Sequence, residues 1–285
     1  MEIAKTIKEV RRFIGAARLR IRRIGFVPTM GALHKGHVSL IEASAKNRDF
    51  VVVSIFVNPT QFGPGEDFNK YPRPIDADIK ICKENNANLV FVPTPKEIYG
   101  SENLTWVNVE RITDALCGQF RPGHFRGVTT VCAKLFNIVQ PDVAYFGQKD
   151  AQQAIVIRRM VADLNMPLQI VVCPTVREQD GLAMSSRNQY LTPQQRKDAT
   201  CIYRALQKCR YMVEAGSRDS KEICAEMRKI LNEPRSIDEI QYVILVNAET
   251  LLPVEKAAGI ILAAVAVKMG TTRLIDNILL DVGRS

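Results

Sequence analysis

A segment with two histidines and two glycines, PTMGALHKGH (residues 28–37), follows a short apolar run and opens a helical pattern. Gly31 and Gly36 let the backbone approach a ligand closely. The free N–H groups and the dipole of a helix start favour phosphate there. His34 and His37 lie three residues apart, so both imidazoles can face one turn and donate to phosphate oxygens. A metal pair or ordinary polar loop residues are the alternatives, but a metal needs a third ligand and the chain has one other histidine.

A second polar loop, GLAMSSRN (residues 181–188), offers two hydroxyls and a forked cation in Ser185, Ser186 and Arg187. These groups suit a triphosphate whose charge shifts during a reaction. Taken alone, the loop is better explained as a flexible linker, because Ser and Arg are common in loops. The presence of H-x-G-H earlier in the chain favours a nucleotide-binding role instead.

The segment YFGQKDAQQ (residues 145–153) lies where a predicted strand leads into a helix. Lys149 would lie at the edge of the sheet and could neutralise a transferring phosphorus centre. Gln153 follows one turn later on the same side and could hold a small polar substrate. For Asp150, capping the helix and binding a ligand are equally supported.

Two amides, Asn58 and Gln61, lie in FVNPTQFGPGEDF at the end of an apolar strand pattern. Amides in such a loop suit recognition of hydroxyl and carboxylate groups. Asn-Pro and Gly-Pro-Gly are also strong turn signals, so turn formation explains Asn58 equally well. For Gln61 we favour a role in binding.

The third histidine, His124, lies in FRPGHFRG (residues 120–127) between Arg121 and Arg126. All three histidines therefore fall in candidate site loops. The two arginines could contact phosphate or carboxylate groups, or they could be surface charges. The sequence leaves open whether any of the three touches a substrate.

Strand and helix patterns alternate up to about residue 175. The run FVVVSIFV is almost continuously β-branched or aromatic, as in a strand buried on both faces. The alternation predicts an α/β fold, a Rossmann-like parallel sheet with helices on both faces and with ligand-binding loops along one edge. The predicted strands are 24–28, 50–57, 88–93, 142–146 and 168–173, and the predicted helices are 36–47, 76–85, 127–139 and 150–165.

After Pro174 the pattern changes to helices followed by successive strands, which predicts a smaller C-terminal α+β domain. The helices are expected at 192–215 and 220–231, and the strands at 239–246, 259–267 and 272–280. We therefore expect a nucleotide-binding domain over 1–175 and a C-terminal lid domain over 176–285. The loop at 174–192 is the expected hinge.

The chain has 285 residues and a formal net charge of +9, with many basic residues before residue 24. A basic patch could bind RNA. However, Ile3, Ile7, Val10, Ile14 and Ala17 repeat at helical spacing, which places the charges on a solvated helix face. Aromatic residues make up 7% of the chain and are not interleaved with the basic residues, as base stacking would require.

Seven cysteines are present, an odd number, and none forms a C-x-x-C pair. This usage predicts reduced core residues of a cytoplasmic protein rather than a disulfide framework or a zinc site. The N-terminal segment lacks the apolar core of a secretory signal, and the longest apolar run is too short for a membrane span. We expect no membrane and no nucleic acid among its partners.

Five segments in this order and spacing resemble the pantothenate synthetase (pantoate–β-alanine ligase) family: PTMGALHKGH, VNPTQFGP, RPGHFRGVTTV, FGQKDAQQ and PTVREQDGLAMSSRNQYL. The resemblance covers nearly the whole chain and implies a nucleotidyltransferase-type enzyme, with MSSR in place of a K-M-S-K-S loop. It implies that ATP and pantoate form pantoyl adenylate and pyrophosphate. The amine of β-alanine then releases pantothenate and AMP. It also implies Mg²⁺ with ATP, and a homodimer.

The resemblance assigns catalytic roles to His34, His37 and Lys149, with His37 as the catalytic acid. Pantoate and β-alanine are expected at Gln61, Gln153 and Asn58. Asp76 and Asp78 are weak candidates for a magnesium ligand, because acids early in a helix commonly complement its dipole. The expected ATP-binding residues are Met30, Gly31, Ala32, Leu33, His34, Lys35, Gly36, His37, Gly147, Gln148, Lys149, Asp150, Val176, Met184, Ser185, Ser186 and Arg187.

A second enzymatic hypothesis is a cytidylyl- or adenylyltransferase acting on a phosphorylated substrate. Such an enzyme shares H-x-G-H but stops at the nucleotide-linked product. A third hypothesis, from another class, is a basic RNA-binding module.

Overall fold

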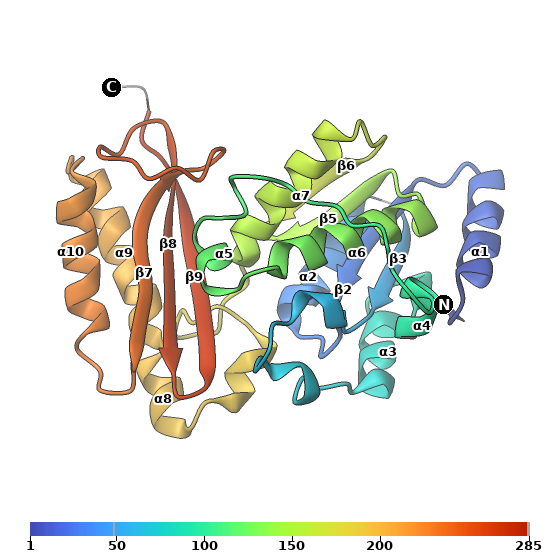
Figure 1. Cartoon of the computed structure of the whole chain (residues 1–285), viewed down its shortest axis with the longest axis horizontal. Helices are drawn as coiled ribbons and strands as arrows, with labels where there is room; N and C mark the ends of the chain where they lie inside the picture. Colours follow the sequence, from blue (N-terminus) through green and yellow to red (C-terminus); the bar gives the residue numbers. More distant parts are fainter. Residues whose placement is uncertain (48, 284–285) are drawn as a thin grey trace. The chain divides into compact units, whose positions relative to one another are not determined.

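A six-stranded parallel sheet forms the core of the N-terminal half in the computed structural model, which describes residues 1–47 and 49–283 (Figure 1). Its strand order is β1-β4-β3-β2-β5-β6, and every neighbouring pair is parallel. The order reverses between β2 and β5, so the loops after these two strands flank the switch point at which such sheets bind ligands. The strands are β1 Glu2–Ala4, β2 Ile24–Thr29, β3 Phe50–Ile55, β4 Leu89–Phe91, β5 Val143–Gly147 and β6 Gln169–Cys173.

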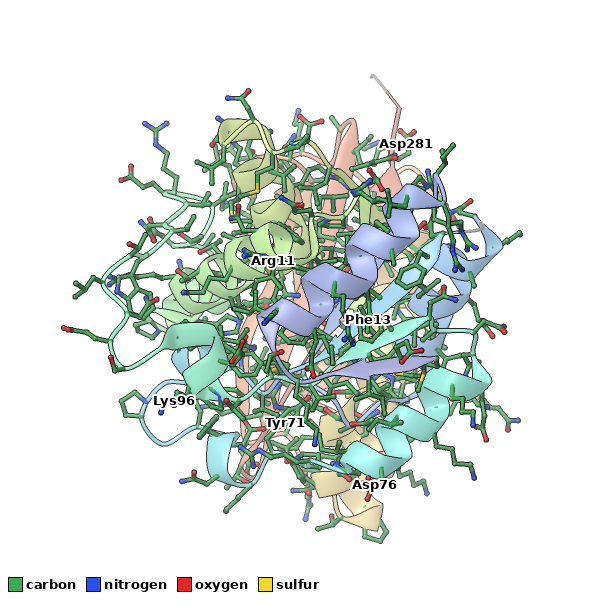
Figure 2. The ribbon with its side chains drawn as sticks, turned by 90° about the vertical axis from the view of Figure 1, so that its right-hand side faces the viewer. Arg11, Phe13, Tyr71, Asp76, Lys96 and Asp281 are labelled. Atoms are coloured by element: carbon green, nitrogen blue, oxygen red, sulfur yellow. The ribbon has the colours of Figure 1, made fainter. Side chains whose placement is uncertain are left out.

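Helices cover both faces of this sheet, as the sequence predicts. On one face Ile41 of α2 packs in a buried cluster with Val27 and Val53. On the other, Phe136 of α6 meets the ring of Phe26 edge-on, with centroids 6.3 Å apart. Figure 2 shows α1 and α6 side by side on that second face, where they contact each other. The helices of this half are α1 Ile7–Leu19, α2 Lys35–Lys46, α3 Ile75–Glu84, α4 Pro95–Tyr99, α5 Cys117–Phe120, α6 His124–Val139 and α7 Ala151–Asp163.

The C-terminal part contains a three-stranded antiparallel sheet in the order β7-β8-β9. Side chains from α9 and α10, among them Leu206 and Met227, form one buried cluster with apolar residues of the three strands. This arrangement confirms the predicted small α+β region. Its elements are α8 Pro193–Asp198, α9 Thr200–Glu214, α10 Ser220–Leu231, β7 Glu239–Asn247, β8 Ile260–Met269 and β9 Thr272–Asp281.

Contacts divide the chain into two compact units. The first unit comprises Met1–Thr113, Arg121–Gln148 and Gln153–Pro174, and the second comprises Asp114–Phe120, Lys149–Gln152 and Thr175–Ser285. Two short segments that precede residue 175 therefore belong to the second unit, and one of them begins with Lys149. The predicted domain boundary at 175/176 and the hinge at 174–192 stay predictions. No helix in the described part of the chain is long and apolar enough to cross a membrane.

Two local predictions were wrong. Residues 2–4 do not continue the N-terminal helix but form β1, which pairs with β4 from Glu2 to Ala4. A three-residue strand is too short to show a period in sequence, and its partner lies far along the chain. The expected helix over 192–215 is divided at Ala199 into α8 and α9. At the division the Ile202 amide donates to the Ala199 carbonyl oxygen, three residues back, instead of to the carbonyl oxygen four residues back as in a regular α-helix.

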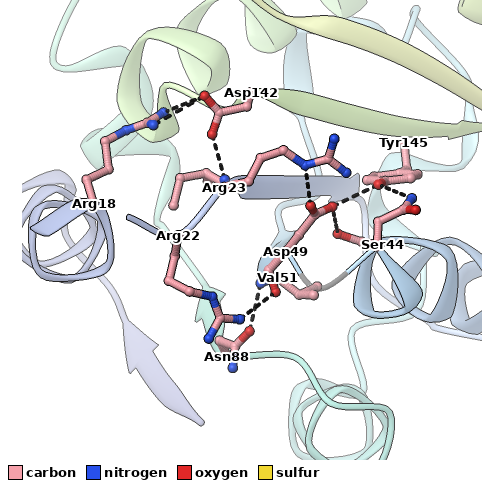
Figure 3. A network of polar contacts seen from close by, with 11 residues as sticks. Arg18, Arg22, Arg23, Ser44, Asp49, Val51, Asn88, Asp142 and Tyr145 are labelled. Carbon is pink, nitrogen blue, oxygen red and sulfur yellow. Dashed lines mark hydrogen bonds and ion pairs between the residues drawn. The ribbon is translucent and has the colours of Figure 1, made fainter. Parts of the chain in front are cut away.

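A buried carboxylate at the amino ends of β2 and β3 also bonds a side chain of β5 (Figure 3). Asp49, whose side chain is fully buried, accepts from Arg23 Nε at 2.6 Å, Ser44 Oγ at 2.9 Å and Tyr145 Oη at 2.8 Å. A Cβ on Gly25 would lie 2.0 Å from Ser44 Oγ, so only glycine fits beneath this network. The network lies at the amino ends of β2 and β3, whereas the loops that carry the candidate site follow the carboxyl ends of these strands.

A second carboxylate, Asp142, extends the network. Its Oδ2 accepts from the Ile24 amide at 2.6 Å and its Oδ1 from Arg18 at 3.2 Å. Arg22 also donates to the carbonyl oxygen of Asp49. Part of the early basic cluster, expected to be only a solvated face, therefore stabilises the base of the sheet.

We predict that Asp49→Ala lowers the free energy of unfolding by about 3 kcal/mol, because several donors lose a buried anionic acceptor at once. The matched control is Asp163→Ala, which removes an exposed i,i+4 partner of Arg159 and should cost at most about 0.5 kcal/mol. Urea unfolding followed by circular dichroism measures both variants. Equal losses would contradict the role given to Asp49.

Candidate active site

The loop after β2 takes its shape from a buried carboxylate on α3. Asp78 is 1% exposed, and its two carboxylate oxygens accept from Ala32 N at 2.9 Å and from Leu33 N at 2.7 Å. Gly31 and Ala32 both have positive φ, 84° and 50°, and a Cβ on Gly31 would lie 2.9 Å from Asp78 Oδ2. Burial raises the pKa of Asp78 above its ordinary value, although the two backbone hydrogen bonds oppose this. Asp78 therefore holds two consecutive left-handed residues in one tight turn.

The side chains of His34 and His37 cap the amino end of α2. His34 Nδ1 accepts from the Gly36 amide at 3.1 Å, and the His34 amide donates to His37 Nδ1 at 3.3 Å. The ring centroids lie 4.1 Å apart, so both imidazoles face one turn, as their spacing predicts. Because each Nδ1 accepts a hydrogen bond, the neutral rings carry their proton on Nε2. An Nε2–H group can donate to a phosphate oxygen.

Most backbone amides of this loop bond within the protein, which differs from the free N–H groups expected of a helix start. Gly31 N donates to Thr29 Oγ1 at 3.2 Å. The other four amides donate to side chains: those of Ala32 and Leu33 to Asp78, that of His34 to His37, and that of Gly36 to His34. The geometry thus favours phosphate recognition by imidazole N–H groups and the helix dipole over recognition by a cradle of bare amides.

Gln61 lies at the end of the short 3-10 turn Pro59–Gln61 and is 8% exposed. Its Nε2 lies 2.9 Å from the sulfur of Met30, so this candidate substrate residue touches the loop after β2. Its backbone carbonyl accepts from His124 Nδ1 at 2.8 Å and from Arg121 Nη2 at 3.3 Å. Both the side chain and the backbone of Gln61 are therefore held by neighbours in the first unit.

Asn58 is 1% exposed, and contacts surround its amide. Its Nδ2 donates to Gln61 Oε1 at 3.1 Å and to the carbonyl oxygen of Gly127 at 3.2 Å. Its Oδ1 accepts from Tyr99 Oη at 2.7 Å and from Thr60 Oγ1 at 3.0 Å. These bonds favour the turn-forming explanation for Asn58, in which it orients Gln61; substrate contact by Asn58 stays a prediction.

The arginines and the histidine of FRPGHFRG take different positions. Arg121 forms a two-pronged ion pair with Glu66, at 2.8 Å and 2.6 Å, and its Nη1 lies 3.1 Å from His124 Nε2. Burial raises the pKa of Glu66, but the hydrogen bonds and charge of Arg121 outweigh this and hold it below the ordinary value. Arg126 lies over the Trp106 ring, 4.5 Å from its centroid. Arg121 and His124 therefore hold the Gln61 turn.

The segment after β5 passes from one unit to the other. Gly147 and Gln148 belong to the first unit, and Lys149 and Asp150 to the second. The side chain of Lys149 is 20% exposed, with its Nζ 3.5 Å from Asp150 Oδ1. Gln153, on α7, returns to the first unit. The sequence motif FGQKDAQQ thus contributes candidate residues to both units.

The MSSR loop is an ordered turn within the second unit. Met184 N donates to the Val176 carbonyl oxygen at 3.0 Å. Ser185 caps the 3-10 turn Ser186–Tyr190 by accepting from Arg187 N at 3.2 Å. The C-terminal part of the expected hinge loop, residues 184–190, therefore forms hydrogen bonds with other residues of the same loop.

The candidate residues form two sets. Residues 30–37 and Gln61 meet in the first unit, and Lys149, Asp150, Val176 and residues 184–187 lie in the second. Within the residues described, no group of three or more His, Cys, Asp or Glu side chains could hold a metal ion. Sequence reasoning missed the clamp by Asp78, considered only as a weak metal ligand, and found no signal for Tyr99. Both depend on contacts between distant segments.

A family model described as "Pantoate-beta-alanine ligase" matches residues 2–279. The chain is 53% identical to a pantothenate synthetase of Moorella thermoacetica, over 99% of each chain. It is 50% identical to a pantothenate synthetase of Acetivibrio thermocellus, over 99% of this chain and all of that one.

Solved structures show the same likeness. The crystal structure of pantothenate synthetase from Thermus thermophilus is similar with a TM-score of 0.93 and 44% identity, over 99% of this chain and all of that one. A pantoate-beta-alanine ligase from Francisella tularensis, complexed with "Beta-gamma ATP and Beta-alanine", is similar with a TM-score of 0.81 and 36% identity. That match covers 98% of this chain and 97% of the other.

We predict that Asp78→Asn weakens ATP binding about tenfold or more, because its NH2 group cannot accept a hydrogen bond and would face one of the two amides, that of Ala32 or that of Leu33, and open the loop. Asp76→Asn is the matched control, since Asp76 lies in the same first turn of α3 but is exposed (Figure 2). Calorimetric titration with ATP measures both variants. Equal affinities of the two variants would contradict the clamp.

Proposed function

The chain belongs to the pantoate-beta-alanine ligase family, which joins pantoate to β-alanine at the expense of ATP, and we propose that it does so through a pantoyl adenylate. In the first step a pantoate carboxylate oxygen attacks the α-phosphorus of ATP, and the bond to pyrophosphate breaks. In the second step the amine of β-alanine attacks the acyl carbon, loses a proton, and AMP leaves. Pantothenate, AMP and pyrophosphate are the products.

The pair of imidazoles at the amino end of α2 carries this proposal. A carboxylate attacking a triphosphate brings two anions together, and the extra charge spreads over the phosphate oxygens and the departing pyrophosphate. His34 and His37 can donate from Nε2 to those oxygens, with His37 as the catalytic acid. Prearranged donors of this kind are each worth about 3 kcal/mol in the transition state.

The remaining ATP contacts are proposed in two sets. In the first unit they are residues 30–37, Gly147 and Gln148. In the second unit they are Lys149, Asp150, Val176 and residues 184–187. The ammonium of Lys149 offsets charge on the phosphates, while the Ser and Arg groups of MSSR suit a triphosphate. The adenylate is prone to hydrolysis, so exclusion of water by motion about the 174–192 loop belongs to the same proposal.

Gln61 and Gln153 are the proposed pantoate contacts, and Gln61 also reaches β-alanine. An amide offers both a donor and an acceptor, which suits a substrate with hydroxyl and carboxylate groups. Asn58 belongs to this group through its hydrogen bond to Gln61 Oε1. Arg121 and His124 are proposed to act indirectly, because both donate hydrogen bonds to the Gln61 carbonyl oxygen and so orient the turn.

Mg²⁺ is proposed to accompany ATP. It commonly keeps several waters and binds substrate phosphates with only one or two protein carboxylates. The donor set fits such a site, because Asp150 supplies a partly exposed carboxylate among the proposed nucleotide residues. Asp78 does not fit as a ligand, since both its oxygens accept backbone amides. When bound, the ion would neutralise phosphate charge.

A cytoplasmic location and a homodimer are also part of the proposal. All seven cysteines lie in the described part of the chain as free thiols, and six of them are buried. Burial raises the pKa of Cys132 to about 12, so this thiol is poorly reactive. Such thiols suit a reducing compartment.

We predict that His37→Ala and Lys149→Ala each lower pantoate-dependent exchange of pyrophosphate into ATP about a hundredfold or more, because each removes a group that stabilises developing charge. The assay contains ATP, pyrophosphate and pantoate without β-alanine. The wild-type chain should exchange only when pantoate is present. Near-normal exchange by either folded variant would refute that residue's role, and pantoate-independent exchange would refute the adenylate.

We predict that Gln153→Ala raises the KM for pantoate about tenfold and leaves the KM for ATP within about twofold, because the lost amide touches only the acid substrate. Gln152→Ala is a useful comparison, since the neighbouring Gln152 bonds the Cys117 amide and the Ala115 carbonyl oxygen. That variant should affect stability more than the KM for pantoate. A parallel rise in the KM for ATP would argue against the assignment of Gln153.

A further inference from the structure

The backbone of Lys149 is fixed by a buried amide of the C-terminal sheet. Asn277, on β9, is 5% exposed and donates from Nδ2 to the carbonyl oxygen of Lys149 at 2.8 Å. The two residues are 128 positions apart in sequence. Lys149 is therefore attached to β9 at the point where the chain leaves β5.

Asn277 is held in turn by a buried ion pair. The carboxylate of Asp276, 3% exposed, accepts from Arg177 Nη1 at 2.5 Å and from Nη2 at 3.1 Å. Its Oδ1 also accepts from the Asn277 amide at 2.7 Å. Burial holds the pKa of Asp276 above its ordinary value, although the hydrogen bonds and charge of Arg177, the Asn277 amide and the charge of Lys149 oppose this. Arg177 is therefore the ion-pair partner of Asp276, whereas the ammonium of Lys149 lies 3.5 Å from Asp150 Oδ1.

Arg177 also fixes the segment that leads to MSSR. Its Nη1 donates to the Gly181 carbonyl oxygen at 3.0 Å, and its backbone forms a bridge with Ala183. Its guanidinium lies 4.5 Å from the centroid of the Tyr203 ring. A Cβ on Gly181 would lie 1.9 Å from Tyr203, so the segment packs directly on α9. The 184–187 loop follows directly after the turn between Arg177 and Ala183.

We propose that the Asp276–Arg177 pair and Asn277 are positioning residues that hold Lys149 and the 184–187 loop in one fixed geometry within the second unit. This inference rests on the proposed contacts of Lys149 and of 184–187 with ATP. Both phosphate-binding segments of this unit then keep their mutual spacing through a single buried network. Asn277 acts on the reaction through its hydrogen bond to the Lys149 carbonyl oxygen.

The test is a double-mutant cycle on pantoate-dependent pyrophosphate exchange, with Asn277→Ala, Lys149→Ala and the double variant. Asn277→Ala should lower kcat between about tenfold and a hundredfold, because a displaced catalytic group forfeits its orientation. The KM for pantoate should stay unchanged. In the Lys149→Ala background the same substitution should lower the residual rate no further, because the side chain to be positioned is already gone.

Asn247→Ala is the control for lost stability. Asn247 lies on β7 of the same sheet and caps the following turn through the amides of Glu249 and Thr250. It should lower the urea midpoint of unfolding but not kcat. Asn277→Ser, which is too short to reach the Lys149 carbonyl, repeats the test with a smaller cavity if the alanine variant does not fold.

Two results would overturn the inference and leave the role of Lys149 intact. In one, Asn277→Ala lowers the exchange rate by the same factor with and without Lys149→Ala. In the other, the kcat of the Asn277 variants stays within about twofold of wild type. Full activity of Lys149→Ala would instead overturn the proposed ATP contact, and the positioning role with it. The single variants thus separate the two failures.

Discussion

The hydrogen bonds from two loop amides to the Asp78 carboxylate are the contact on which the loop before His34 and His37 depends. Gly31 and Ala32 adopt a conformation that is unfavourable for most residues, and it persists because a buried anion needs the amide donors of Ala32 and Leu33. With those amides committed, the histidines complete the helix start themselves. Their mutual capping leaves the proton on Nε2, so the loop presents imidazole donors rather than bare backbone.

The same principle recurs in the turn that carries Gln61. Asn58, Arg121 and His124 are polar or charged residues whose groups bond the turn around Gln61. A buried polar group is stable only when it is hydrogen-bonded, so these residues secure the turn as well as surround it. The second unit uses a buried ion pair to the same end, with Asp276 and Arg177 between β9 and the MSSR segment. Asp49 and Asp142 form their hydrogen bonds near the amino ends of the parallel strands, whereas the candidate site residues follow the carboxyl ends.

Residue patterns predicted most elements of both units within a few residues. They failed for β1, whose three residues show no period, and at Ala199, where two helices replace one continuous helical pattern. For the candidate site, the spacing of His34 and His37 predicted that both rings could face one turn. It did not predict that each Nδ1 would be consumed by capping, because that depends on the path of the loop held by Asp78.

The sequence by itself determined the alternation of strands and helices, the family and the residue types available for chemistry, because periodicity and motifs are properties of consecutive residues. Only the tertiary structure decided what those residues do. Asp78 meets Leu33 across 45 positions and Asn277 meets Lys149 across 128, and no local pattern encodes such partners. Asp78 thus changed from a candidate metal ligand into a loop clamp, and Lys149 became part of the second unit. Burial and hydrogen-bond satisfaction arise only when distant segments pack together.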